Sequence, residues 1–317
     1  MPSSIVVVGS INLDLVCTGE RIPAPGETLK GNRFQTFHGG KGANQAVAVA
    51  RLGHPVNIIG KVGDDDFGDR LRRGLRDAHV GVRNVFTVSG VSSGVALITV
   101  DAAGQNSITV IPGANGQLLP RDLEKSLPQL RSAAIILTQL EIPMETVEYL
   151  CATARRFNIP VVLDPAPAGP IPRRILRNVA WLTPNETETC ALCGIAPHEL
   201  TSANVDSVAE LLLGRGPLNV IVKMGRRGAY VAGADGLRRM IPAFKVNAID
   251  STAAGDAFNA GLAVGLVRGM PLVDAARYGA AVGALSTTRA GAQASMPSVR
   301  EVSRLLEPAR ERHRRTR

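Results

Sequence analysis

The sequence predicts an α/β protein whose mostly parallel central sheet is covered by helices on both faces and carries a small additional β-sheet. Short β-branched runs alternate with amphipathic segments, and the runs are apolar throughout, as in strands that are buried on both faces. The 317 residues, 45% of them hydrophobic, suffice for a large core in one elaborated domain or in two domains. Composition and patterning thus indicate a globular protein.

The apolar runs are the expected strands, and the amphipathic segments are the expected helices. The strands are Ile5–Gly9, Val56–Gly60, Ala134–Leu140, Val161–Asp164, Val179–Thr183 and Asn219–Lys223. The helices are Ala43–Leu52, Phe67–Ala78, Met144–Phe157, Val205–Leu213, Asp256–Val267 and Leu272–Thr287. Because helices separate the strands, the sheet is expected to be mostly parallel.

Two strand-like regions, Leu13–Phe37 and Ser93–Ile111, break this alternation because they contain polar residues and turn signals. They could pair into a separate sheet that acts as a lid and excludes water from a site beneath it, or they could be edge strands of the main sheet. We expect a lid of residues 13–37 and 93–111. The α/β domain then comprises residues 1–12, 38–92 and 112–308, and the basic tail 309–317 is expected to be disordered.

Charge and cysteine usage narrow the possible partners and location. The formal net charge of +9 suits an acidic small substrate such as a nucleotide, whereas only 3% aromatic residues disfavour nucleic-acid binding through base stacking. The first apolar run is too short for a signal sequence or a membrane span, so a cytoplasmic location without membrane association is expected. Of the four cysteines, only Cys190 and Cys193 have ligand-like spacing, and nothing nearby completes a zinc site.

The most informative segment runs from Asp250 to Asn259, where small residues separate two aspartates. Without bulky side chains, the main-chain N–H groups can approach an anion, and a helix that starts near Gly255 adds the positive end of its dipole. A carboxylate at Asp256 would repel phosphate, but it is well suited to take a proton from an alcohol that attacks a phosphoryl group. The alternative is an ordinary helix-capping aspartate.

Further polar groups follow strand ends, where α/β ligand sites lie. Asn12 and Asp14 alternate after the first strand, and Glu141 follows another, so each could bind sugar hydroxyls or simply face solvent. The segment from Gly39 to Asn44 is either a ligand loop or a tight turn that caps the next helix. The dinucleotide-binding and Walker A spacings are both absent, which disfavours a Rossmann dehydrogenase and a P-loop NTPase.

Together, four motifs resemble the ribokinase family of carbohydrate kinases over residues 5–306. They are Gly9-Ser10-Ile11-Asn12-Leu13-Asp14, Gly39-Gly40-Lys41-Gly42-Ala43-Asn44-Gln45, Thr183-Pro184-Asn185-Glu186-Thr187-Glu188 and the segment Asp250–Asp256. The resemblance implies phosphorylation of D-ribose at O5 by ATP with Mg²⁺, activation by a monovalent cation such as K⁺, and a homodimer in which two lids clasp. Deoxyribose or a nucleoside remains an alternative acceptor. A sugar sensor without turnover is disfavoured because the base and the anion hole are intact.

The resemblance also implies residue roles. Asp256 matches the catalytic base, and Ala253, Ala254 and Gly255 match the anion hole for the transferring phosphoryl group. Sugar-binding positions match Asn12, Asp14, Gly39, Gly40, Lys41, Asn44 and Glu141. Nucleotide-binding positions match Asn185, Lys223, Met224, Gly225, Arg226, Arg227, Gly228, Gly255 and Ala280. Glu188 matches a position that assists Mg²⁺ indirectly, and K⁺-site positions match Asp250, Thr252, Ser286, Arg289, Gly291 and Ser295.

Three residues depart from the family pattern. Lys223 stands where a smaller polar residue is common, and Ala280 stands where an Asn or His often borders the adenine. Asp164 replaces a frequent Asn. The first two departures leave nucleotide preference and affinity open.

Overall fold

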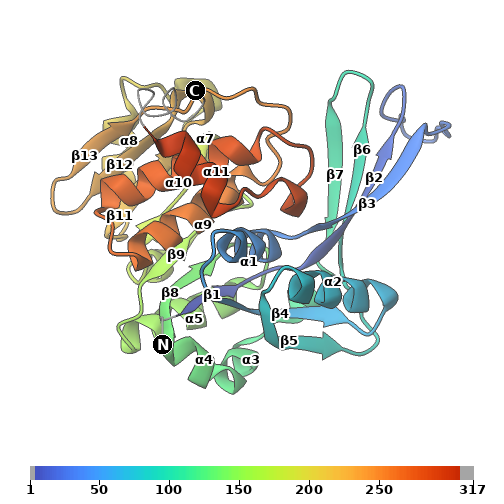
Figure 1. Ribbon diagram of the computed structural model, residues 1–317, viewed down its shortest axis with the longest axis horizontal. Helices are drawn as coiled ribbons and strands as arrows, with labels where there is room; N and C mark the ends of the chain where they lie inside the picture. The colour runs from blue at the N-terminus through green and yellow to red at the C-terminus, as the bar shows by residue number, and fades with distance from the viewer. Residues whose placement is uncertain (1–3, 308–317) are drawn as a thin grey trace, which may run out of the picture.

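The computed structural model describes residues 4–307, in which a nine-stranded sheet forms the centre of the molecule (Figure 1). Its strand order is β13-β12-β11-β10-β9-β8-β1-β4-β5. Neighbours pair in parallel from β5 to β11, and β12 and β13 add an antiparallel edge. The strands are β1 (Ser4–Val8), β4 (Val56–Gly63), β5 (Gly81–Val88), β8 (Ala133–Thr138), β9 (Val161–Leu163), β10 (Trp181–Leu182), β11 (Asn219–Lys223), β12 (Ala229–Gly233) and β13 (Arg238–Ile241).

Helices cover both faces of this sheet and bury a separate apolar cluster on each. One face carries α1 (Lys41–Arg51), α2 (Asp66–Asp77), α9 (Ala254–Val267), α10 (Leu272–Ser286) and α11 (Val299–Leu306). The other carries α3 (Pro120–Lys125), α4 (Leu127–Arg131), α5 (Met144–Arg156), α6 (Arg173–Leu176), α7 (Glu186–Cys193) and α8 (Val205–Leu213). None of the helices within residues 4–307 is long and apolar enough to cross a bilayer.

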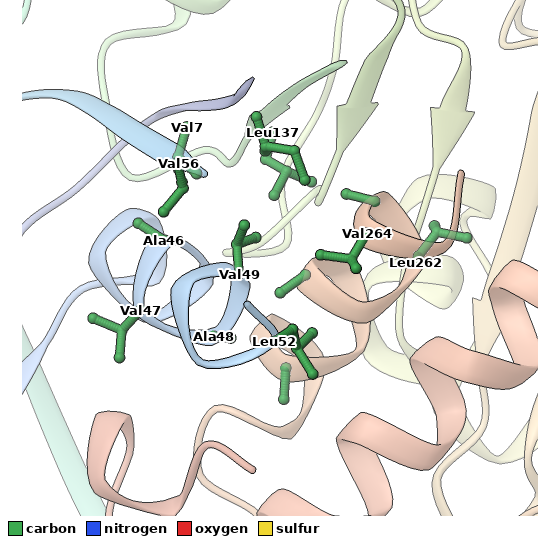
Figure 2. Packing of buried hydrophobic residues seen from close by; sticks show 14 of the residues in the cluster. Val7, Ala46, Val47, Ala48, Val49, Leu52, Val56, Leu137, Leu262 and Val264 are labelled. Atoms are coloured by element: carbon green, nitrogen blue, oxygen red, sulfur yellow. The ribbon is translucent and has the colours of Figure 1, made fainter. Parts of the chain in front are cut away.

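Alternate side chains of each central strand point into opposite clusters, which explains why the strands are apolar throughout. In β1, Val7 packs with the α1 and α9 cluster, whereas Val6 and Val8 pack on the other face. Figure 2 shows the first of these clusters, where Val49 of α1 lies near Leu137 of β8. The predicted fold class is confirmed.

Four further strands form a separate sheet in the order β3-β2-β6-β7. They are β2 (Asn12–Thr18), β3 (Arg33–Gly39), β6 (Gly94–Val100) and β7 (Asn106–Ile111). In Figure 1 this sheet projects from the α/β body. The alternative that these regions are edge strands of the main sheet is therefore wrong. The predicted tail, 309–317, lies outside the described residues.

Candidate active site

Asp256 and the residues predicted to bind the sugar gather beyond the carboxyl ends of β1 and β8, where the order of the sheet reverses. From β1, the chain adds β4 and β5 on one side and β8 to β11 on the other. Such a switch point leaves a crevice beyond the strand ends, which is the usual ligand site of an open α/β sheet. The N-termini of α1 and α9 contribute residues to the same region, since their residues Asn44 and Asp256 are bonded to each other.

Asp256 is held by two amides of α1 rather than by the end of its own helix. Its Oδ2 accepts a hydrogen bond from Asn44 Nδ2 at 3.0 Å, and its Oδ1 accepts one from Gln45 Nε2 at 3.1 Å. The cap of α9 is Ala253, and no side chain caps that helix. The reading of Asp256 as an ordinary capping aspartate is therefore wrong.

Burial sets the basicity of Asp256. Its side chain is only 4% exposed. Burial raises the pKa of the carboxyl to about 6, with nearby Lys41 acting in the opposite direction and Asp164 adding to the increase. At neutral pH the group is therefore ionised and more basic than an ordinary aspartate.

The start of α9 provides main-chain donors beside this carboxylate. Ala253 adopts a left-handed conformation, with φ of 58°, and turns the chain into the helix that begins at Ala254. The first turn of a helix leaves N–H groups without intrahelical partners. Gly255 lies close to the ammonium of Lys223: a Cβ at position 255 would be 3.3 Å from Lys223 Nζ. The arrangement suits an anion that needs both amides and a positive charge.

The glycine loop makes room for Asp14. A Cβ on Gly39 would lie 2.3 Å from Asp14 Oδ1, and Gly40 has φ of 85° at the start of α1. Burial, followed by the charges of Glu141 and Asp256, raises the pKa of Asp14 to about 7. Asp14 is therefore a partly buried member of the polar cluster and not a fully solvated surface aspartate.

Asn12 is positioned by a residue that the sequence did not single out. Asn115 Nδ2 donates to Asn12 Oδ1 at 2.6 Å, and Asn115 Oδ1 accepts from the main-chain N–H of Ile11 at 2.9 Å. The only signal for Asn115 is the turn-forming Pro112-Gly113 pair that precedes it. Gly94 is needed here as well, since its Cβ would lie 2.2 Å from Asn12 Oδ1.

Glu141 and Lys41 complete the cluster of residues that the sequence predicts to bind the sugar. Glu141 Oε2 accepts from Ser10 Oγ at 2.5 Å and from the main-chain N–H of Lys41 at 3.2 Å. Burial opposes the charge of the Lys41 ammonium, but Asp256, Asp164, Glu141 and Glu188 outweigh it and raise the pKa of Lys41. The residues predicted to bind the sugar thus come together from β2, β3, α1 and the end of β8.

Most of the predicted nucleotide residues lie beside α7 and β11, whereas Gly255 and Ala280 belong to α9 and α10. Asn185 Oδ1 accepts from the Glu188 N–H at 2.8 Å, and Glu188 Oε2 accepts from the Asn185 N–H at 2.7 Å. The N–H of Lys223 donates to the carbonyl of Pro184 at 2.8 Å, which brings this segment to the end of β11. Burial raises the pKa of Glu188, and both of its oxygens already accept bonds from Asn185.

In the loop after β11, Arg227 serves the structure of the protein. Its guanidinium donates to the Leu200 carbonyl at 3.1 Å and pairs with Glu186, whereas Arg226 is exposed. Met224 is buried, and Gly225 and Gly228 both have positive φ. Ala280 is partly buried in α10. Among these predicted nucleotide positions, Lys223 and the exposed Arg226 carry charged side chains that are not tied to the neighbouring loop, whereas Met224, Gly225 and Gly228 offer main chain.

The predicted K⁺ positions centre on Asp250, which ties two loops together. Its Oδ1 accepts from the N–H of Thr252 at 2.9 Å, and its Oδ2 accepts from the N–H of Gly291 at 2.8 Å. These bonds lower the pKa of Asp250 although burial opposes them. Its anionic oxygens and the surrounding carbonyls are the donors that a hard cation prefers.

The side chains at three of the remaining predicted K⁺ positions are bonded within the protein. Ser286 Oγ donates to the Gly283 carbonyl and Ser295 Oγ to the Ala292 carbonyl, each at 2.8 Å. The side chain of Arg289 pairs with Glu301. Among residues 4–307, no group of three or more His, Cys, Asp or Glu side chains is arranged to hold a metal ion.

A cavity of about 570 Å³ lies between β3, α1, α2 and residues 292–294. His38, Arg51 and Arg70 are among the residues that line it. None of the predicted sugar or nucleotide residues does. The cavity is therefore distinct from the candidate active site.

The chain matches known carbohydrate kinases over nearly its whole length. Residues 2–299 match the family described as pfkB family carbohydrate kinase. The chain is 40% identical to a ribokinase of Schizosaccharomyces pombe over 94% of this chain and 96% of the relative. It is 37% identical to a deoxyribokinase of Salmonella typhi over 95% and 98% of the two chains.

A solved structure agrees in both fold and extent. The Arabidopsis thaliana ribokinase complexed with ribose and ATP has a TM-score of 0.92 to this structure and 32% sequence identity, covering 98% of this chain and 100% of that one. The chain therefore belongs to the pfkB family of carbohydrate kinases.

Proposed function

We propose that this kinase transfers the γ-phosphoryl group of ATP to O5 of D-ribose, with Asp256 as the general base and residues 253–255 as the anion hole. The observation that carries the proposal is the buried Asp256 carboxylate, held at 3.0 Å by Asn44 and at 3.1 Å by Gln45 beside the first turn of α9. The full-length similarity to enzymes named ribokinase supports the choice of sugar.

The chemistry follows from the position of each group. Asn12, Asp14, Glu141 and the loop from Gly39 to Asn44 hold the sugar hydroxyls. Asp256 takes the proton from O5 as that oxygen attacks the γ-phosphorus in line. Fixed main-chain N–H groups of residues 253–255 stabilise the charge that develops on the phosphoryl oxygens.

The proposal assigns the small sheet the role of a lid. Residues 13–37 and 93–111 would close over the sugar and exclude water, on an α/β domain formed by residues 1–12, 38–92 and 112–308. Two apolar side chains on one face of this sheet, Ile108 and Val110, are 53% and 47% exposed. Their exposure supports a homodimer in which two lids clasp.

Nucleotide and cations complete the proposed site. The ATP phosphates would lie between Lys223, Gly255 and the main chain of residues 224–228, with the adenine toward Ala280. Bound Mg²⁺ would neutralise charge on the phosphates, with Glu188 helping through a metal-bound water. Asp250 and the carbonyls of the 250–252 and 289–295 loops would hold K⁺. A reducing cytoplasmic location agrees with four free cysteines among the described residues.

A substrate panel tests the proposal. ADP release is measured with ribose, deoxyribose and a nucleoside, each with and without K⁺ in the presence of Mg²⁺. The expected result is the highest kcat/KM with ribose and a further increase with K⁺. A preference for deoxyribose, which the Salmonella typhi relative makes the second candidate, would replace ribose as the substrate. Sugar binding without ADP release would indicate a sensor.

A further inference from the structure

Two residues that depart from the family pattern, Lys223 and Asp164, contact each other. Lys223 Nζ lies 3.0 Å from Asp164 Oδ1, and the two side chains are only 11% and 4% exposed. A buried charge without a partner is costly, so each residue makes the other tolerable. The two departures therefore form one ion pair.

This ion pair is connected to Asp256 through Gln45. Gln45 Nε2 donates to Asp164 Oδ2 at 3.3 Å and to Asp256 Oδ1 at 3.1 Å. Gln139 Nε2 donates to Gln45 Oε1 at 2.7 Å, which fixes the amide so that its N–H groups face the two carboxylates. Gln45 and Gln139 are completely buried, so water does not replace these bonds.

Lys223 also faces the anion hole. Its Nζ is 3.3 Å from the position that a Cβ would occupy on Gly255. A lysine ammonium has three donors, so it can bond to Asp164 and to a phosphate oxygen. A phosphate held by the first turn of α9 would share this ammonium with Asp164 and so weaken its neutralisation of Asp164.

We propose that Lys223, Asp164 and Gln45 form a relay that links the nucleotide phosphates to the catalytic carboxylate. Before nucleotide binds, Asp164 holds Lys223 beside the anion hole. When phosphate draws the ammonium away, Asp164 is less neutralised, and Gln45, which bonds both carboxylates, passes the change to Asp256. The inference rests on the proposed function, in which Asp256 is the base. Gln45 and Asp164 are positioning residues in this scheme.

The direction of the effect follows from the charges around Asp256. The negative charge of Asp164 raises the pKa of Asp256, so weaker neutralisation of Asp164 makes the base stronger when ATP is present. The other charged groups of the cluster are Lys41 on α1, Asp14 on β2, Glu141 after β8 and Glu188 on α7. The neighbouring helix α10 presents Gly279, Val282 and Gly283 to α9, and none of these carries a charge.

The test is a double-mutant cycle with Asp164→Asn, Lys223→Gln and the double variant. The readouts are the acid limb of the kcat/KM profile for ribose and the Kd for ADP. Asp164→Asn is expected to move the acid limb to lower pH and Lys223→Gln to higher pH, whereas the double variant should match Asp164→Asn, because Lys223 acts on Asp256 only through Asp164. Lys223→Gln should also weaken ADP binding about tenfold, the usual effect of losing a charged hydrogen bond.

Gln45→Met provides the matched test of the link itself. It is expected to lower kcat while leaving the Kd for ADP within about twofold, because Gln45 contacts the base and not the nucleotide. The relay would be overturned if the acid limbs of the variants stay at the wild-type pH, or if the pH shifts of the two single variants simply add in the double variant. Either result counts against the relay even if all variants lose thermal stability. Failure of the proposed function is distinguishable, since the wild-type protein would then release no ADP with ribose.

Discussion

At the residue scale, the site depends on side chains whose charge is set by burial. Asp256 and Asp14 both have raised pKa values, about 6 and about 7, because burial disfavours their anions. Each carboxylate also acts on its neighbours, so the cluster titrates as a unit. Lys41 supplies the opposing positive charge.

The raised pKa of Asp256 predicts how activity depends on pH. The base must be ionised to accept a proton, so kcat/KM for ribose should be constant above about pH 8 and fall about tenfold per pH unit below about pH 6. The measurement is a pH profile of ADP release under subsaturating ribose. A profile that stays flat down to pH 4.5, close to the pKa of an ordinary aspartate, would contradict the assigned base.

The contact between Gly39 and Asp14 predicts a defect specific to sugar binding. In Gly39→Ala, the added methyl would lie 2.3 Å from both Asp14 oxygens and displace the carboxylate. We expect KM for ribose to rise at least about tenfold, with KM for ATP little changed. Gly19→Ala is the matched control, since its Cβ meets nothing closer than Arg21 O at 3.6 Å. Equal KM values for ribose in the two variants would exclude Asp14 from sugar binding.

At the element scale, central strands are easier to predict than edge strands. Every central strand expected from the sequence is present, although Val179–Thr183 contributes only Trp181–Leu182. The unpredicted strands β5, β12 and β13 lie at the two edges of the sheet. The outermost strands β5 and β13 carry charges, such as Arg83 and Arg239, so they lack the continuous apolar pattern. β12 is buried and apolar, but its two alanines and its glycine are weak strand formers. The unpredicted helices, of four to eight residues, are too short to show a helical period.

A buried ion pair that joins β4 to α3 predicts a large loss of stability. Lys61 Nζ lies 2.7 Å from Asp122 Oδ2, and the side chains are 8% and 6% exposed. Asp122→Asn leaves the ammonium unpaired, so the free energy of unfolding in urea should fall by about 3–5 kcal/mol. The double variant Lys61→Met and Asp122→Asn should recover most of this loss.

An exposed pair gives the control for this prediction. Arg174 and Glu148 are paired at the surface, with 67% and 36% of their side chains exposed. Glu148→Gln should lower the free energy of unfolding by less than about 1 kcal/mol. If Asp122→Asn and Glu148→Gln lowered the free energy of unfolding by similar amounts, burial would not be what sets the contribution of the Lys61–Asp122 pair.

At the scale of the whole molecule, the fold assembles one site from segments that are far apart in the chain. The sequence could reveal its local motifs, such as the glycine loop at residues 39–45 and the Asp250–Asp256 segment. It could not reveal that Gln45 bonds Asp256, because the two are 211 positions apart. The Asp164–Lys223 pair was likewise visible only as two separate departures. Such contacts form because the fold places the ends of β9 and β11 beside the start of α1.

The root of the small sheet shows how the body positions the predicted lid. Asp65, at the start of α2, accepts a hydrogen bond from the N–H of Ser93 at 2.8 Å and another from that of Gly68, also at 2.8 Å. Ser93 directly precedes β6. The strands of the small sheet therefore leave the body from a fixed point beside α2, which covers the main sheet.

The most direct test of the account is turnover by Asp256→Asn. The amide keeps the size of the side chain but cannot act as a base, so ribose-dependent ADP release should fall by about 10²–10⁴ while the circular dichroism spectrum and the Kd for ADP stay close to wild type. Asp77→Asn, an exposed change on α2, is the matched control and should keep full activity. Activity of Asp256→Asn within a few fold of wild type would contradict the central claim that this carboxylate takes the proton from the sugar.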